Sequence, residues 1–253
     1  MCMPGFVMSD FRLLSEVSLS AGSKRLVLPP GRNDAVSAHW SQCVAANPRL
    51  FNGSAFLFEV PIIDPVRRTL TATGLATDYA TFLYWRQFRD EMGYHHLFPV
   101  GAIVTADDRL LVGRMSAHTA NAGRIYPPAG SFDRDDIVAG EDGVSGEDGA
   151  RFLDPLANIA REIGEEIGLS IDLFEPEDGW LMIASTPRAH ALVRILRTRV
   201  TSADLRPAIE RHIAEDPHQE LASIEFVGFE TRYPEGAASP YVNDLLAYLG
   251  RVG

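Results

Sequence analysis

Residues 154–169 read DPLANIAREIGEEIGL, and this stretch carries the strongest indication of local structure in the chain. Asp154 is a good N-cap because its side chain can accept hydrogen bonds from the first backbone N–H groups of a helix. Pro155 suits the first helical position, and Gly168 is well placed to end the helix. The pattern therefore predicts a helix that begins after Asp154 and stops at Gly168.

Three carboxylates lie on one face of this predicted helix. Glu162 precedes Glu165 and Glu166 by three and four residues, which is the spacing of helical neighbours. Arg161 can bridge to Glu165 at the i, i+4 spacing, but one arginine cannot neutralise three carboxylates. A cluster of hard oxygen ligands suits Mg²⁺ or Mn²⁺. The alternative is a solvated acidic face with an ordinary glycine cap.

The order of residues 161–169, REIGEEIGL, resembles the second half of the Nudix box. That half reads Arg-Glu-apolar-any-Glu-Glu-any-Gly-apolar, and every specified position is matched. The resemblance implies a Nudix hydrolase, an α/β/α sandwich with a mixed sheet, which cleaves a nucleoside diphosphate linked to another group. It also implies that Glu162, Glu165 and Glu166 bind Mg²⁺, or alternatively Mn²⁺. Glu162 and Glu165 would act in catalysis, with Arg161 orienting the glutamates.

The first half of the box departs from the family pattern. Gly130 resembles the glycine that opens the box, but it lies 31 positions before Arg161, which makes this segment 17 residues longer than in the family. Leu153, which cannot bind metal, stands in the place of the first box glutamate. The inserted stretch, residues 131–154, holds eight carboxylates and two arginines and is predicted to be a long surface loop.

A carboxylate of this insertion could replace the missing glutamate. The candidates are Asp133, Asp135, Asp136, Glu147 and Asp148. The alternative is a solvated acidic insertion with no role in the site.

A narrower resemblance covers more of the chain. Residues 47–53 (NPRLFNG), 77–79 (TDY), 98–101 (FPVG) and 106–108 (ADD) are similar to the UDP-glucose pyrophosphatase branch of the Nudix family. That branch also has an N-terminal extension and an expanded box. The resemblance implies a UDP-sugar substrate that is split into UMP and a sugar 1-phosphate. The alternatives are an ADP-ribose or coenzyme A type diphosphatase, or a non-catalytic nucleotide-binding module.

Several further residues are candidates for binding a nucleoside diphosphate. Forked guanidinium donors suit pyrophosphate oxygens, and aromatic rings can stack on a base. The substrate-binding candidates are Arg114, Arg124, Tyr126 and Gly130, followed by Arg188, Tyr79, Trp85 and the acid Glu220. The alternatives are surface salt bridges for the arginines and core packing for the aromatic residues.

Strands alternate with helices throughout the chain, which predicts an α/β (α+β) class. We expect a smaller N-terminal α+β subdomain over residues 1–95, packed on a hydrolase domain over residues 96–253. The clearest elements outside residues 154–169 are two strands broken at Ala21-Gly22, a helix opened by Thr77 or Asp78, and a hairpin over residues 97–116.

The composition limits the possible partners. Apolar residues make up 46% of the 253 residues, which is typical of globular proteins. A net charge of −11 disfavours nucleic acids and anionic membranes. No apolar run is long enough to span a bilayer, the start lacks the pattern of a secretory signal, and Cys2 and Cys43 cannot form a disulfide framework. We therefore expect a cytoplasmic protein that binds a small nucleoside diphosphate. The sequence leaves the oligomeric state open.

Overall fold

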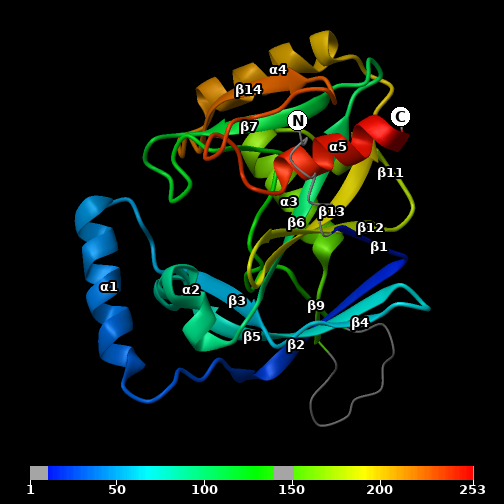
Figure 1. The fold of residues 1–253 in the computed structure, drawn as a ribbon. Helices are drawn as coiled ribbons and strands as arrows, with labels where there is room; N and C mark the ends of the chain where they lie inside the picture. The colour runs from blue at the N-terminus through cyan, green and yellow to red at the C-terminus, as the bar shows by residue number, and fades with distance from the viewer. Residues whose placement is uncertain (1–10, 140–150, 253) are drawn as a thin grey trace, which may run out of the picture.

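The computed structural model describes residues 11–139 and 151–252. It contains five α-helices and two β-sheets within these residues, and each sheet mixes parallel and antiparallel strands (Figure 1). The predicted α+β class is confirmed. Cys2, Glu147 and Asp148 lie outside the described residues.

The larger sheet forms the framework of the C-terminal part. Its strand order is β1-β12-β13-β6-β7-β14, with β11 (Glu175–Pro176) added to β13 and β8 (Ile125–Tyr126) added to β7. The parallel pair is β13 with β6, and the other pairs are antiparallel. These strands are β1 (Phe11–Leu14), β12 (Trp180–Thr186), β13 (Ala189–Arg197), β6 (His96–Val104), β7 (Leu110–Met115) and β14 (Leu221–Val227).

Helices cover both faces of this sheet. On β6, Gly101 faces α3 (Pro155–Ile167), where a Cβ would contact Ile159 and Ile163. Phe98 points to the other face, because strand residues alternate, and its ring contacts Tyr241 immediately before α5 (Val242–Val252). Another helix, α4 (Ser202–Glu215), lies beside α3 and β14. The result is the α/β/α layering that the family resemblance implies.

The smaller sheet is built mainly from the N-terminal part of the chain. Its order is β3-β5-β2-β10-β9, with β4 paired to β5. Helix α1 (Arg32–Ala46) contacts α2 (Tyr79–Met92), which packs against β3 and β5. The strands are β2 (Glu16–Arg25), β3 (Ser54–Phe58), β4 (Ile62–Asp64), β5 (Thr69–Asp78), β9 (Ile137–Ala139) and β10 (Arg151–Leu153).

The two sheets exchange strands. The N-terminal β1 pairs with β12 at the edge of the larger sheet, and β10 pairs with β2 in the smaller one. A shared apolar cluster joins the two sheets, with Phe56 and Phe58 from the smaller sheet and Leu97 and Leu192 from the larger. Strands therefore cross a boundary at residue 95 in both directions, and the division at that residue stays a prediction.

Two expectations about local structure were wrong. Residues 131–154 are not only loop, because β9 and β10 pair with each other and join the smaller sheet. The strand does not break at Ala21-Gly22. Instead β2 continues through both residues, with a register shift between Ala21 and Arg25 that absorbs the irregularity. A β-bulge of this kind lets a glycine stand within a strand.

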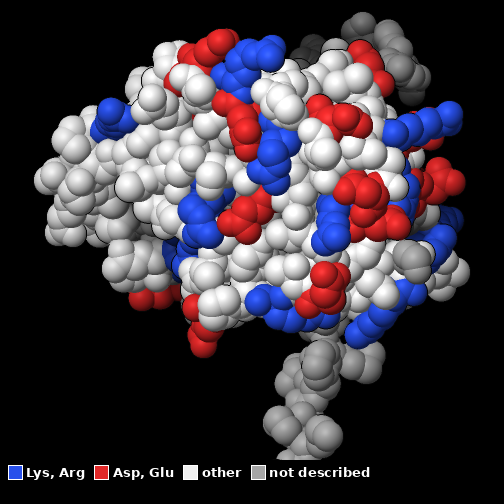
Figure 2. All heavy atoms as spheres, turned by 90° about the horizontal axis from the view of Figure 1, so that it is seen from above, with Lys and Arg blue, Asp and Glu red and all other residues white. Residues whose placement is uncertain are grey.

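Charges of both signs are mixed on the surface. Figure 2 shows acidic and basic side chains side by side over the face drawn, with no broad area of one sign. Some of them form ion pairs, such as Arg206 with Glu210 on α4. None of the helices in residues 11–139 and 151–252 combines the length and apolar character needed to cross a membrane.

Candidate active site

The helix predicted from residues 154–169 is α3, and both of its ends are as expected. The Asp154 side chain accepts hydrogen bonds from the backbone N–H groups of Leu156 and Ala157, and Gly168 ends the helix in the left-handed conformation. Apolar residues at a spacing of four, Ile159, Ile163 and Ile167, are buried in the main core. This packing fixes the rotation of α3, with Glu166 buried beside the isoleucines, Glu162 mostly buried and Glu165 exposed.

Arg161 lies at the centre of a group of carboxylates. Its guanidinium is 2.9 Å from Glu162, 3.1 Å from Glu165 and 3.2 Å from Asp136. The contact with Glu165 is the i, i+4 pair expected from the sequence. A forked guanidinium can contact several carboxylates at once, so Arg161 fixes how they are oriented.

Among the described carboxylates of the inserted stretch, Asp136 reaches Arg161 most closely. Its side chain is only 2% exposed, and it accepts hydrogen bonds from Asn158 Nδ2 at 2.8 Å and from the Asp133 backbone N–H at 2.9 Å. Asp133 is 3.9 Å from Arg161, whereas Asp135 is exposed. Leu153 is buried in the apolar cluster between the sheets. Asp136 thus provides a buried carboxylate beside Arg161, while Leu153 contributes to the core.

Gly130 lies directly against Glu162, although 31 positions separate Gly130 from Arg161 in the chain. A Cβ at position 130 would overlap the Glu162 carboxylate, so a larger residue there would force the Glu162 side chain to move. The backbone of the neighbouring Ala129 donates a hydrogen bond to Glu166. The structure therefore brings the end of the Tyr126–Gly130 segment against the acidic residues of α3.

The glutamates of this site repel one another in a buried setting. Burial raises the pKa of Glu162 to about 7, and the nearby Glu165, Glu220 and Asp136 add to the rise against the opposing effect of Arg161. Burial, together with Glu162 and Glu220, holds the pKa of Glu166 well above its usual range. Burial also raises the pKa of Glu220. The site thus holds more buried carboxyl groups than its one arginine could neutralise if all of them were ionised.

The chemistry of these donors fits a hard divalent cation. Glu166 is 6% exposed and has no salt bridge to any residue that the structure describes, so its ionised form lacks a counterion. Carboxylate oxygens are the ligands that Mg²⁺ and Mn²⁺ prefer. Within residues 11–139 and 151–252, no three acidic, histidine or cysteine side chains are already grouped as a metal cage.

The metal-free chain should become less stable as pH rises, because Glu162 keeps its proton to a higher pH in the folded state than in the unfolded chain. The folded state keeps a proton on this side chain up to about pH 7, whereas the unfolded chain loses it near pH 4.5. The free energy of unfolding should fall between these values, by at most about 1.4 kcal/mol per pH unit. Buried His96 acts in the opposite sense, because its pKa is lowered to about 3.

The measurement is therefore the difference in pH slope between wild type and Glu162→Gln. Urea unfolding at pH 5, 6 and 7 in EDTA should show a more positive slope for the variant. Glu210→Gln, an exposed substitution on α4, should match wild type. Equal slopes for wild type and Glu162→Gln would contradict the prediction.

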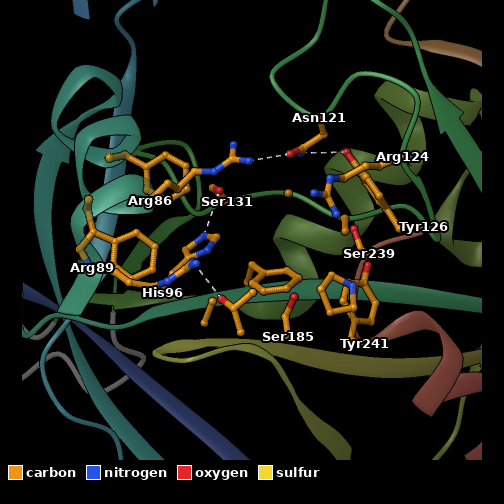
Figure 3. Close-up of a pocket in the computed structure, with 18 of the residues that line it drawn as sticks. Arg86, Arg89, His96, Asn121, Arg124, Tyr126, Ser131, Ser185, Ser239 and Tyr241 are labelled. Carbon is orange, nitrogen blue, oxygen red and sulfur yellow. Dashed lines mark hydrogen bonds between the residues drawn. The ribbon is translucent and has the colours of Figure 1, made fainter. Parts of the chain in front are cut away.

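A cavity of about 350 Å³ opens beside the acidic face of α3. Gly130 and Ser131 form part of its lining, with Tyr126 and Tyr241 on the side of the larger sheet (Figure 3). The buried hydroxyl of Tyr241 has no hydrogen-bond partner among the described residues. His96 is hydrogen-bonded to Ser131 Oγ at 3.1 Å through Nε2. Helix α2 closes the other side with Tyr79, Phe82, Trp85, Arg86 and Arg89.

The predicted substrate-binding residues divide into two groups. Arg124, Tyr126 and Gly130 line the cavity, as do Tyr79 and Trp85. Arg114 does not line it, because its guanidinium turns toward Glu225 at 3.2 Å and the Gly123 carbonyl. Arg188 is also outside the lining and contacts the Gly93 carbonyl. Glu220 lies close enough to raise the pKa of Glu162 and Glu166.

Sequence reasoning missed several cavity residues. Arg86 and Arg89 could have been found, because they follow Phe82 and Trp85 at helical spacing on the predicted helix. His96 had no usable pattern. The missed lining residues with polar side chains are Arg86, Arg89, His96, Asn121, Ser131, Ser185, Thr186, Ser239 and Tyr241.

No family model and no curated protein matches the sequence. Solved structures do match the fold of part of the chain. The MutT protein of Methanosarcina mazei Go1 is 16% identical over 62% of this chain and 94% of its own, with a TM-score of 0.40. A Nudix hydrolase from Nitrosomonas europaea is 17% identical over 63% and 90%, with a TM-score of 0.37. The Nudix domain of Shewanella oneidensis NrtR, in a cocrystal with ADP ribose, is 9% identical over 67% and 96%, with a TM-score of 0.39. At these values the function has to be inferred from the side chains of the chain itself.

Proposed function

We propose that this chain is a divalent-metal-dependent hydrolase of the Nudix type, which cleaves the diphosphate bond of a nucleoside diphosphate derivative. One observation carries the proposal: the acidic face of α3, with Arg161 among its carboxylates, meets Gly130 at the edge of a cavity lined by arginines and aromatic rings. Acidic metal ligands beside cationic phosphate ligands are what hydrolysis of a diphosphate requires.

Glu162, Glu165 and Glu166 are the residues that would hold Mg²⁺ or Mn²⁺. The bound cation would polarise phosphoryl oxygens and make water more acidic. Burial raises the pKa of Glu162 to about 7 in the metal-free chain, and a bound cation would lower that pKa, so Glu162 would be ionised at neutral pH and able to bind the cation or accept a proton from water. Arg161 orients Glu162 and Glu165, and Asp136 in turn fixes Arg161.

The substrate we favour is a UDP-sugar, which follows from the narrower sequence resemblance. The cavity wall has chemical groups that match such a ligand. It combines aromatic rings with serine and threonine hydroxyls, which can bind a base or a sugar. ADP-ribose and coenzyme A derivatives carry the same diphosphate and are the alternatives. We further propose that residues 1–95 belong to the working unit, because α2 forms one wall of the cavity.

Incubation with UDP-glucose and Mg²⁺ should yield UMP and glucose 1-phosphate. EDTA should abolish the reaction, because without a cation the anionic carboxylates repel the negatively charged phosphoryl oxygens. In H₂¹⁸O the label should enter only one product, since water attacks one phosphorus atom. Mass spectrometry identifies both products and the label.

A parallel screen of ADP-ribose, dinucleotides and coenzyme A separates the alternatives. Cleavage of those compounds with UDP-sugars untouched would refute the UDP-sugar assignment and leave the hydrolase assignment standing. A non-catalytic nucleotide-binding module would instead be stabilised by a ligand, with a raised Tm, and would form no product.

A further inference from the structure

Helix α2 brings two arginines to the cavity. Arg86 and Arg89 are three residues apart and therefore lie on one face of the helix, with Phe82 and Trp85 one turn earlier. Arg89 donates a hydrogen bond to Thr186 Oγ1 at 3.1 Å. Figure 3 shows Arg86 reaching from α2 toward Asn121, on the side of the cavity where Arg124 lies. The cationic side of the cavity thus comes partly from the N-terminal part of the chain.

Arg86 is held in a defined orientation. Its Nη2 donates to Asn121 Oδ1 at 2.9 Å, and Asn121 Nδ2 donates to the Tyr126 hydroxyl at 3.1 Å. These two bonds connect α2 to the strand that precedes Gly130. A guanidinium has five N–H donors, so the bond to Asn121 leaves others available to a ligand.

Arg86 has no counterion among the acids whose side chains the structure describes. It is half-buried, and no salt bridge joins it to any of these acids. None of them lines the cavity, whereas three arginines do. A partly desolvated cation without a negative partner costs free energy, which an anionic ligand would recover.

Arg86 and Gly130 both line the cavity, and Gly130 lies directly against Glu162 of α3. Arg86 is joined to the Tyr126 hydroxyl through Asn121. Burial raises the pKa of the Tyr126 phenol, Glu166 raises it further, and Arg86 opposes the rise. The carboxylate of Glu166 on α3 and the guanidinium of Arg86 on α2 therefore both affect the Tyr126 phenol electrostatically. A diphosphate between them would be attracted to the guanidinium, and its other phosphate could reach the carboxylates only through a cation.

We propose that Arg86 binds a phosphate of the substrate opposite Glu166, so that α2 supplies a specificity-determining residue from outside the Nudix-like part of the chain. This inference rests on the proposed function and adds to it. A ligand whose diphosphate extends from the carboxylates toward α2 gains the contact with Arg86. A ligand with a single phosphate, bound at the carboxylates, does not.

The test is Arg86→Gln in the full-length chain. KM for the substrate found in the screen should rise about tenfold to a hundredfold, because hydrogen bonds to charged groups are lost. The kcat should change by less than about threefold, since Arg86 contributes equally to binding before and during the reaction. Arg86→Lys keeps the charge without the fork and should recover part of the loss. Arg206→Gln on α4 is the matched control and should leave KM unchanged.

Calorimetric binding of inorganic pyrophosphate in EDTA separates this inference from the proposed function. Arg86→Gln should weaken that binding about tenfold, with or without turnover. If wild type hydrolysed nothing in the screen but the variant still bound pyrophosphate more weakly, the anion site would stand and the proposed function would fail. If wild type hydrolysed its substrate and the variant changed neither KM nor pyrophosphate binding, the inference would be overturned.

Discussion

Glu166→Gln should give a folded protein whose activity with Mg²⁺ has fallen by about a thousandfold or more, a loss of about 4 kcal/mol in transition-state stabilisation. The amide keeps the size of the side chain but removes the charge that would bind a divalent cation. In EDTA the variant should unfold at a higher temperature than wild type at pH 8. Burial and the neighbouring Glu162 and Glu220 make the Glu166 charge unfavourable, and this cost disappears in the amide.

Two measurements are needed together: kcat/KM at saturating Mg²⁺, and Tm with and without Mg²⁺. Wild type should gain Tm on addition of Mg²⁺, since the cation binds only the folded state, and Glu166→Gln should gain much less. Glu210→Gln on α4 should behave as wild type in both. Near wild-type turnover of Glu166→Gln would show that the metal site has been assigned wrongly.

A truncated chain that begins at His96 should fail to fold into a soluble, active protein. Removal of residues 1–95 uncovers five side chains of the cluster shared by the two sheets, and each contributes roughly 1.5–3 kcal/mol when fully buried. The total is comparable with the whole stability of a typical domain, about 5–15 kcal/mol. Those side chains are Leu97, Phe132, Leu153, Met182 and Leu192. The edge of β12 would also lose its partner β1.

Solubility, the near-ultraviolet circular dichroism spectrum and hydrolysis kinetics should be compared with those of the full-length chain. Any folded fraction should show a greatly raised KM, because Arg86 and the aromatic wall of α2 are missing from the cavity. A stable monomer with unchanged kinetics would show that residues 1–95 are an independent appendage.

The local features of the fold could be predicted from the sequence because their causes lie a few residues apart. Asp154 and Gly168 define α3, and Asp78 caps α2, since its side chain accepts from the Thr81 backbone N–H. The grouping of Glu162, Glu165 and Glu166 follows from helical periodicity alone. These predictions needed no knowledge of what the rest of the chain does.

Other features depend on residues far apart in the chain, and the sequence left them open. Five carboxylates could have approached Arg161, and the choice of Asp136 follows from β9 and β10 joining the smaller sheet and placing its side chain beside Asn158. Arg114 was expected to bind substrate, but the pairing of β7 with β14 places it beside Glu225. Strand pairing of this kind has no local pattern.

The exchange of strands between the two sheets also sets the order in which the chain can fold. Leu14 pairs with Trp180, so β1 cannot pair with β12 until most of the chain has been synthesised. At roughly 5–20 residues per second the delay is on the order of ten seconds. Likewise β2 cannot complete its pairing until β10 follows. Because such long loops must close before the contacts form, folding should be slow, and neither sheet can serve as a finished template for the other.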